Sequence, residues 1–257
     1  MSYEKLFDLS GKSALVAGGG GELGREMAAG LAHFGARLII ADARKGAAQE
    51  AGDYVGQAGG EARYEAVNVM KDDDLNSLFQ GIEEKEGGLD ILVNCIGAII
   101  RKPILEQTND EWEQVVNLNL TGAMRISRAA AALMVKRGKG KIVHISSAVG
   151  LLAYPEFSAY ASSKAGLNML IKVQAMEWAP SGINVNGIAP GTAITRLNRD
   201  YYEEDPSRLK QKIAKIPAAR LATCSDFVGA IVFLCSSASD YVHGVTIPVD
   251  GGRTIAG

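Results

Sequence analysis

Residues 13–24, Ser13-Ala-Leu-Val-Ala-Gly-Gly-Gly-Gly-Glu-Leu-Gly24, are the stretch that decides the fold. The apolar first half predicts a buried strand, and apolar residues at helical spacing over 23–34 predict a helix that Gly35 ends. A second apolar run follows at 38–42. Strand, glycine-rich turn, helix and strand form a βαβ unit, whose backbone N–H groups and helix N-terminus suit a pyrophosphate.

The same alternation continues along the chain. We expect strands near 63–68, 90–94, 141–146, 184–189 and 245–249, and helices near 45–57, 72–86, 109–137, 158–178 and 225–236. Because helices alone separate nearly all strands, the pattern predicts an α/β fold with a doubly wound, seven-stranded parallel sheet and helices on both faces. The exception is a polar insertion at about 192–219, a position typical of lids. We expect one dinucleotide-binding and catalytic domain over 1–257.

The bulk composition excludes several classes of protein. A net charge of −2 gives no reason to expect nucleic acid or an anionic membrane as a partner. The polar start is not a signal peptide, and no apolar run reaches membrane-spanning length. Three scattered cysteines and three scattered histidines favour reduced thiols in a cytoplasmic protein and no metal site.

Asp42 ends the second strand, eighteen residues after Gly24. A carboxylate there can bind both ribose hydroxyls of an adenosine, and it repels a 2′-phosphate. We therefore expect NAD as the cofactor, with NADP less favoured. Arg44 is a counter-signal, because a basic residue just beyond that strand can hold a 2′-phosphate.

Tyr160 and Lys164 are four residues apart, so on a helix they share a face. A phenol has a pKa near about 10, and an ammonium one turn away favours the phenolate, which allows acid/base catalysis near neutral pH. The alternative is a half-buried aromatic beside a solvated charge. A short motif of this kind needs its context before it indicates a function.

That context is a resemblance to the short-chain dehydrogenase/reductase family over nearly the whole chain. The family's motif Thr-Gly-x-x-x-Gly-x-Gly appears at 17–24, with Ala17 and Glu22 as departures. A carboxylate at 22 is unfavourable near a pyrophosphate unless it points away or acts as a helix N-terminal charge. Further family markers are Asn68-Val69, Asn94-Cys95-Ile96-Gly97, Asn119, Ser147 thirteen residues before Tyr160, Pro190-Gly191-Thr192-Ala193-Ile194-Thr195 and Asp250-Gly251-Gly252.

The resemblance implies a Rossmann fold and hydride transfer between a nicotinamide and a carbinol or carbonyl carbon. The implied catalytic residues are Asn119, Ser147, Tyr160 and Lys164. Tyr160 would be the general acid/base, Lys164 would lower its pKa and bind the nicotinamide ribose, Ser147 would orient the reacting oxygen, and Asn119 would hold a water. The implied cofactor-binding residues are Gly18, Glu22, Leu23, Gly24, Asp42, Asn68, Val69, Asn94, Gly97, Tyr160, Lys164, Pro190, Gly191, Ala193 and Thr195.

Stretches 101–106, 177–179, 195–198 and 237–242 resemble the sugar-acid dehydrogenases of this family, the gluconate 5-dehydrogenases among them. The substrate would then be a small-molecule alcohol or ketone, most consistently a sugar acid or polyol. The candidate substrate residues are Arg101, Ser147, Leu152, Tyr154, Tyr160 and Asn198. Lys102 and Arg196 are further candidates, although solvated loop charges explain all these cations equally well. Ile99, Ile100, Leu151 and Leu152 make part of the pocket apolar.

The resemblance also implies a homotetramer, or a homodimer, built on the helices that carry Asn119 and Tyr160. Two other functions compete with the dehydrogenase. One is an NADPH-dependent ketoreductase of the 3-oxoacyl type, which Asp42 disfavours. The other is a dinucleotide-binding sensor without turnover, which the intact set of Ser147, Tyr160 and Lys164 disfavours.

Overall fold

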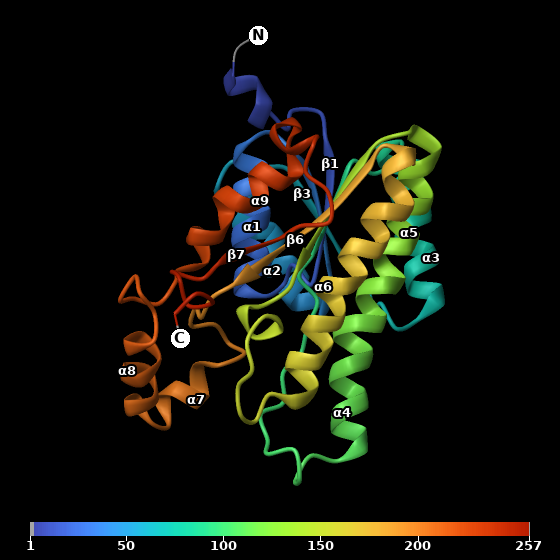
Figure 1. The fold of residues 1–257 in the computed structure, drawn as a ribbon. Helices are drawn as coiled ribbons and strands as arrows, with labels where there is room; N and C mark the ends of the chain where they lie inside the picture. Colours follow the sequence, from blue (N-terminus) through green and yellow to red (C-terminus); the bar gives the residue numbers. More distant parts are fainter. Residues whose placement is uncertain (1–2, 257) are drawn as a thin grey trace.

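The computed structural model describes residues 3–256. Its centre is one seven-stranded sheet with the order β3-β2-β1-β4-β5-β6-β7, in which every pair is parallel (Figure 1). The strands are β1 (Ser13–Ala17), β2 (Arg37–Asp42), β3 (Ala62–Ala66), β4 (Ile91–Asn94), β5 (Gly140–Ile145), β6 (Ile183–Pro190) and β7 (Thr246–Val249). The predicted sheet is confirmed, and each strand boundary lies within two residues of the expected one.

Helices cover both faces of this sheet, as predicted. They are α1 (Glu22–His33), α2 (Lys45–Gln57), α3 (Asp72–Glu86), α4 (Asn109–Val116), α5 (Gly122–Arg137), α6 (Ser158–Trp178), α7 (Arg199–Glu203), α8 (Pro206–Ala214) and α9 (Val228–Cys235). Short 3-10 turns lie at Tyr3–Phe7, Ala148–Gly150, Ala179–Ser181, Cys224–Phe227 and Ser237–Ser239. No helix within residues 3–256 is long and apolar enough to cross a membrane.

Two apolar cores sandwich the sheet. Leu15 and Ala17 of β1 pack with α3, α5 and α6, whereas Ala14 and Val16 pack with α1, α2 and α9. A central parallel strand is buried on both faces, so its residues form a continuous apolar run instead of an alternating one. This is why β1 could be recognised from sequence.

The chain runs outward from β1 to β3 and then returns to place β4 on the other side of β1. At this switch point the loops after β1 and β4 diverge, and such crevices at the carboxyl ends of strands are where doubly wound sheets bind ligands. The loops after β5, β6 and β7 open at the same edge.

Two predicted elements differ in detail. The helix expected over 109–137 has a π-helical turn, Asn117–Thr121, between α4 and α5. The insertion forms two short helices, α7 and α8, which lie beside the C-terminal segment (orange and red in Figure 1). A π turn is a small local adjustment that is frequent at functional sites, and hydrophobic spacing alone does not reveal it.

Candidate active site

The glycine-rich turn after β1 packs directly against the loop after β4. Gly18 has a φ of +74°, and a Cβ there would lie 2.8 Å from the backbone N of Ile96. A Cβ on Gly24 would lie 2.7 Å from the carbonyl oxygen of Gly18. The turn therefore requires glycine at both positions, and Leu23 between them, in the first turn of α1, packs against the core.

Glu22 begins α1, where the family motif has a glycine. Its carboxylate accepts hydrogen bonds from the backbone N of Arg196 at 2.6 Å and from Nη2 of Arg199 at 2.7 Å. The carboxylate therefore points away from the turn and toward the insertion. One of the two conditions expected for a carboxylate at this position is met, and the contact joins the glycine motif to the start of α7.

Asp42 lies at the end of β2 and is 9% exposed. Its Oδ1 accepts hydrogen bonds from the backbone N of Arg44 at 3.0 Å and from Nε of Arg44 at 3.1 Å. A Cβ on Gly20 would lie 2.8 Å from Asp42 Oδ2, so the carboxylate faces the glycine turn. The guanidinium of Arg44 offsets part of the negative charge that disfavours a 2′-phosphate.

Three predicted cofactor residues, Asn94, Asn68 and Val69, have side chains that are engaged within the protein. Asn94 is 1% exposed, accepts a hydrogen bond from the N of Ile96 at 3.2 Å and pairs with Nδ1 of His144 at 3.1 Å. Asn68 accepts from the N of Met70 at 3.0 Å and closes a turn. Val69 is buried in the core, and its carbonyl accepts from Nε of Arg125 at 2.7 Å.

The predicted catalytic residues come together from three segments. Lys164 on α6 is 3% exposed and donates to the carbonyl oxygen of Ile145 at 2.7 Å. Asn119, in the π turn, accepts from the N of Ala98 at 2.8 Å and donates to Oγ of Ser163 at 3.0 Å. A Cβ on Gly97 would lie 3.6 Å from Nζ of Lys164 and 3.4 Å from Oδ1 of Asn119, so this glycine keeps the space above them open.

Tyr160 and Ser147 complete this group. Ser147 follows β5 and accepts a hydrogen bond from the N of Val149 at 3.1 Å, which fixes its hydroxyl. It also forms a hydrogen bond with Tyr160 that favours the phenolate. The ammonium of Lys164 lies 5.8 Å from the centroid of the Tyr160 ring.

The Lys164 ammonium does not by itself bring the pKa of Tyr160 below its ordinary value in the protein alone. Burial of the phenol raises its pKa, and the opposing influences are the Ser147 hydrogen bond and the positive charge of Arg101. Burial also lowers the pKa of Lys164 to about 8, because its ammonium is removed from water and no carboxylate within residues 3–256 pairs with it. Helical spacing could not show that the ammonium points at the Ile145 carbonyl.

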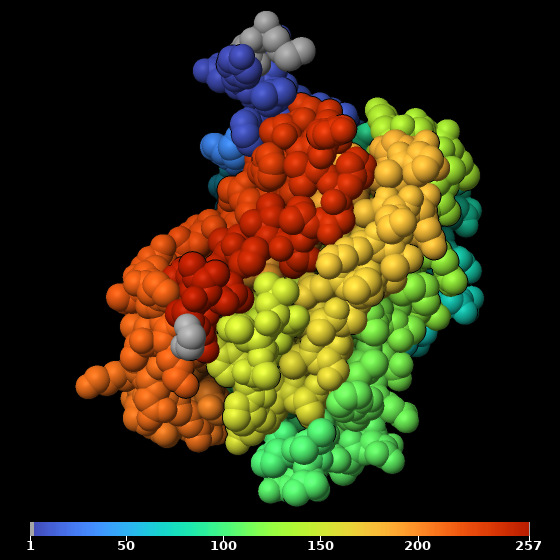
Figure 2. Space-filling model, in the orientation of Figure 1, coloured from blue at the N-terminus to red at the C-terminus, as the bar shows by residue number. Residues whose placement is uncertain are grey.

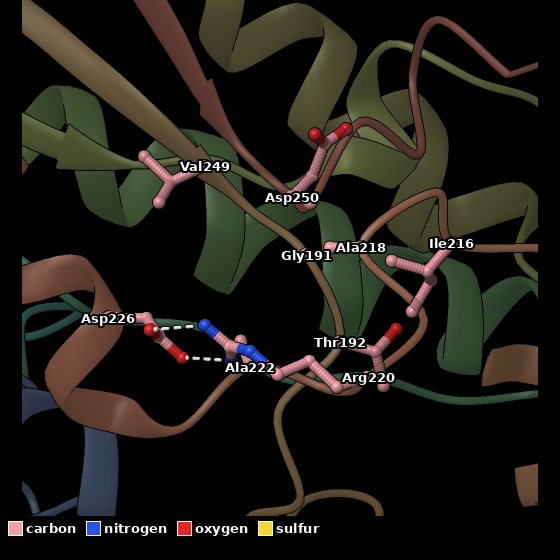
Figure 3. A pocket seen from close by; sticks show the side chains of 10 residues that line it. Gly191, Thr192, Ile216, Ala218, Arg220, Ala222, Asp226, Val249 and Asp250 are labelled. Atoms are coloured by element: carbon pink, nitrogen blue, oxygen red, sulfur yellow. Dashed lines mark hydrogen bonds and ion pairs between the residues drawn. The ribbon is translucent and has the colours of Figure 1, made fainter.

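The Pro190–Thr195 segment follows β6 and borders a cavity of about 150 Å³ (Figure 3). Gly191 and Thr192 line one side, and Arg220 pairs with Asp226 at 2.7 and 2.9 Å across one end. Tyr160 does not line this cavity, which lies under the segment that the resemblance places beside the nicotinamide.

The candidate substrate residues divide into two groups. Arg101 and Tyr154 lie near Tyr160, since Phe157 connects them by ring contacts. Asn198, in contrast, accepts from the N of Thr195 and donates to the carbonyl of Ala193, so its amide braces the loop. Lys102 is paired with Glu111 at 2.9 Å, so a substrate anion would compete with this ion pair. Leu152 is half-buried in the loop that carries Tyr154.

Sequence reasoning did not single out two cations beside Tyr154. Lys212 on α8 lies 4.2 Å from the ring centroid, and Nε of Arg253 donates to the Tyr154 hydroxyl at 2.8 Å. No spacing rule connects α8 with the segment after β7, so the sequence carried no signal for this pair. Their convergence is a result of tertiary structure.

Comparison with known proteins agrees with this geometry. A family model described as Enoyl-(Acyl carrier protein) reductase matches residues 20–254. The chain is 35% identical over 251 residues to 5-keto-D-gluconate 5-reductase of Escherichia coli K12, which covers 98% of both chains. It is 37% identical over 247 residues to 2-dehydro-3-deoxy-D-gluconate 5-dehydrogenase of the same organism, which covers 96% of both.

A solved structure is similar over the full length. The gluconate 5-dehydrogenase from Burkholderia cenocepacia, in complex with NADP and tartrate, superimposes with a TM-score of 0.94. The two chains are 35% identical, and the alignment covers 99% of each.

Proposed function

The chain belongs to the short-chain dehydrogenase/reductase family, and we propose that it interconverts a secondary alcohol of a sugar acid and the corresponding ketone with NAD(H). Membership makes it an oxidoreductase that acts on CH–OH donors. The observation that carries the proposal is the convergence of Ser147, Tyr160 and Lys164 below Gly97, next to the cationic residue Arg101.

The crevice fits a dinucleotide. The glycine turn presents backbone where a side chain would clash, Asp42 faces that turn, and Gly97 leaves room above Lys164. The turn at 18–24 would hold the pyrophosphate, Asp42 the adenosine ribose, and Lys164 the nicotinamide ribose. The backbones of Asn68, Val69 and the 190–195 segment would complete the site. When bound in its oxidised form, the nicotinamide supplies the hydride acceptor and a positive charge that favours a phenolate nearby.

The proton is managed by this chain's own residues. In oxidation Tyr160, as phenolate, accepts the proton of the substrate hydroxyl while Ser147 donates a hydrogen bond to the reacting oxygen. Arg101 stabilises the phenolate by its charge, and we propose that the Lys164 ammonium acts in the same direction. In reduction Tyr160 donates the proton. Hydrogen bonds with Asn119 fix both the loop at Ala98 and the Ser163 side chain on α6. We propose that the π turn that carries Asn119 binds the water that connects Lys164 with solvent.

We propose NAD(H) over NADP(H) as the preferred cofactor. The buried carboxylate of Asp42 supports this choice, because a 2′-phosphate beside it would be repelled. The Arg44 guanidinium, bonded to that carboxylate, weakens the discrimination. We therefore expect a preference of about tenfold, which corresponds to about 1.4 kcal/mol, and not exclusive use of NAD.

A sugar acid is the substrate class that the relatives and the pocket support together. The relatives named above act on gluconate derivatives, and Arg101 offers a guanidinium that suits a carboxylate. We also propose a cytoplasmic homotetramer. Exposed Met169, Val173 and Met176 along α6 support an interface there.

A substrate panel tests this function. Sugar acids, their matched polyols, hydrophobic secondary alcohols and a 3-hydroxyacyl thioester are offered with NAD and with NADP, and reduced nicotinamide is followed by its absorbance. We expect the highest kcat/KM for a sugar acid with NAD. Faster turnover of the thioester or of a hydrophobic alcohol would exclude the substrate class, and a higher kcat/KM with NADP would exclude the cofactor choice.

A further inference from the structure

Four positively charged side chains surround two tyrosines at the rim of the site. Tyr201 lies between Arg101 and Arg208, each with its guanidinium carbon 4.3 Å from the ring centroid. Tyr154 is contacted by Lys212 at 4.2 Å and by Arg253 at 5.4 Å. We call the insertion at 192–219, which carries α7 and α8, the lid. Figure 2 shows the lid (orange), the C-terminal segment (red) and the loop after β5 (yellow-green) next to one another on one face.

Among residues 3–256, three of these cations have no carboxylate to balance them. Arg208 lies 3.5 Å from both Glu204 and Asp205, but within residues 3–256 neither Arg101, Lys212 nor Arg253 takes part in an ion pair. Nε of Arg101 is buried without any hydrogen-bond partner. Other cationic side chains of this protein form ion pairs with carboxylates, as Lys102 does with Glu111.

The unbalanced charges repel one another. Burial, with the positive charges of Arg253, Lys215 and Arg101, lowers the pKa of Lys212 to about 8. A half-buried group of like charges is unfavourable unless an anion joins it. The arrangement therefore has the electrostatic character of a binding site for a negatively charged group.

The cationic group also lies within reach of a substrate whose reacting oxygen is at Tyr160. The rings of Tyr154 and Phe157 are 6.0 Å apart, and those of Phe157 and Tyr160 are 6.2 Å apart. A group held beside Tyr154 is thus several bonds away from the atom that Tyr160 protonates. The distance suits one end of a small linear acid whose reacting carbon is remote from the carboxylate.

We propose that Lys212 and Arg253 bind the carboxylate of the substrate from opposite segments, with Arg101 on its inner side. This deepens the proposed function and rests on it: the substrate is an acid and not a polyol, and its carboxylate connects the lid helix α8 with the segment after β7. Lys212 and Arg253 are thereby specificity-determining residues.

The test compares D-gluconate with D-glucitol, which has the same carbon chain without the charge. At pH 7, Lys212→Met is expected to lower the ratio of kcat/KM for D-gluconate to that for D-glucitol about tenfold, the scale of a lost charged hydrogen bond. Arg253→Met is expected to lower the same ratio, and the double variant to lower it further. The matched control is Lys210→Met, on the same helix but exposed, which should leave the ratio unchanged.

Equilibrium binding separates this inference from the function. Calorimetric titration of D-gluconate into the NADH-loaded protein needs no turnover, so it applies even if the enzyme acts on another alcohol. Weaker binding to Lys212→Met than to Lys210→Met supports the anion site, whatever the panel shows. Equal binding to both variants, or no binding to the native protein, overturns it. Circular dichroism and NADH titration confirm that each variant is folded.

Discussion

Two lysines with a similarly lowered pKa, Lys164 and Lys212, lie in regions of opposite character. Both have a pKa of about 8. Lys164 belongs to the buried group of catalytic residues, which we call the floor. There the Asn119 amide and the Ile145 carbonyl both form hydrogen bonds. Lys212 belongs to the rim formed by Arg101, Arg208, Lys212 and Arg253, where cations lie over aromatic rings and Lys212 is repelled by its neighbours. The floor is complete without a ligand, whereas the rim requires one.

This difference shows how the site divides its tasks. A preorganised floor holds acid/base groups in place before the reaction and needs no rearrangement at the moment of proton transfer. A rim with unbalanced charge gains most when the correct ligand arrives, so it contributes selectivity. Changes to the floor should therefore affect the rate, and changes to the rim should affect the choice of substrate.

The largest expected effect concerns the floor. Tyr160→Phe keeps the ring and removes the phenolic hydroxyl, so we expect kcat to fall by at least ~10²-fold, the lower scale for a lost acid/base group. NADH binding should be nearly unchanged by fluorescence titration. Tyr241→Phe, at a fully exposed tyrosine, is the control and should retain full activity. Full activity in Tyr160→Phe would refute the assigned mechanism.

A second effect concerns the stability cost of the floor. The pKa of Lys164 is lowered from 10.5 to about 8, so below pH 8 the folded protein keeps a buried charge at a cost of about 3 kcal/mol. Lys164→Met removes this cost but also a hydrogen bond worth about 1 kcal/mol. We expect the inactive variant to be more stable by about 2 kcal/mol at pH 7.

The sign of the pH dependence makes this prediction specific. Between pH 8 and 10.5, Lys164 binds more protons in the unfolded protein than in the folded one, so the stability of the native protein rises with pH. The extra stability of Lys164→Met should therefore disappear by about pH 10. Urea unfolding at pH 7 and pH 10 measures it. Lys172→Met, exposed on the same helix, should show no such trend. A variant less stable than the native protein at both pH values would contradict the expectation.

The smallest expected effect concerns the lid. Glu22→Gln weakens the contact between α1 and Arg199, and an exposed ion pair contributes at most about 1 kcal/mol. We expect trypsin to cleave within 199–214 up to about fivefold faster, because the lid opens more often. Glu204→Gln has the same chemistry on the lid but no contact with α1, and serves as control. Identical cleavage rates in the two variants would show that Glu22 does not hold the lid.

Much of the fold could be predicted because its signals are local. β1 and β2 are apolar runs, α1 begins at the glycine turn, and α2, α3 and α6 have the bounds expected from hydrophobic spacing. The order of the strands, with β4 on the other side of β1 from β2 and β3, was not predicted and is a result of the structure. Cys95, Cys224 and Cys235 are free thiols, as expected from their scattered positions. The π turn at Asn119 was not predicted, since hydrophobic spacing alone does not reveal it.

The sequence by itself determined the sheet, the glycine turn and the identity of Ser147, Tyr160 and Lys164 as the candidate reacting groups, because spacing within one element or one βαβ unit specifies them. Only the tertiary structure decided where charges meet. It directed Lys164 to the Ile145 carbonyl, turned Glu22 toward Arg199, used Asn198 as a brace and brought Lys212 and Arg253 to Tyr154. These contacts join residues far apart in the chain, and electrostatic energy depends on distance and burial, which a linear sequence does not contain.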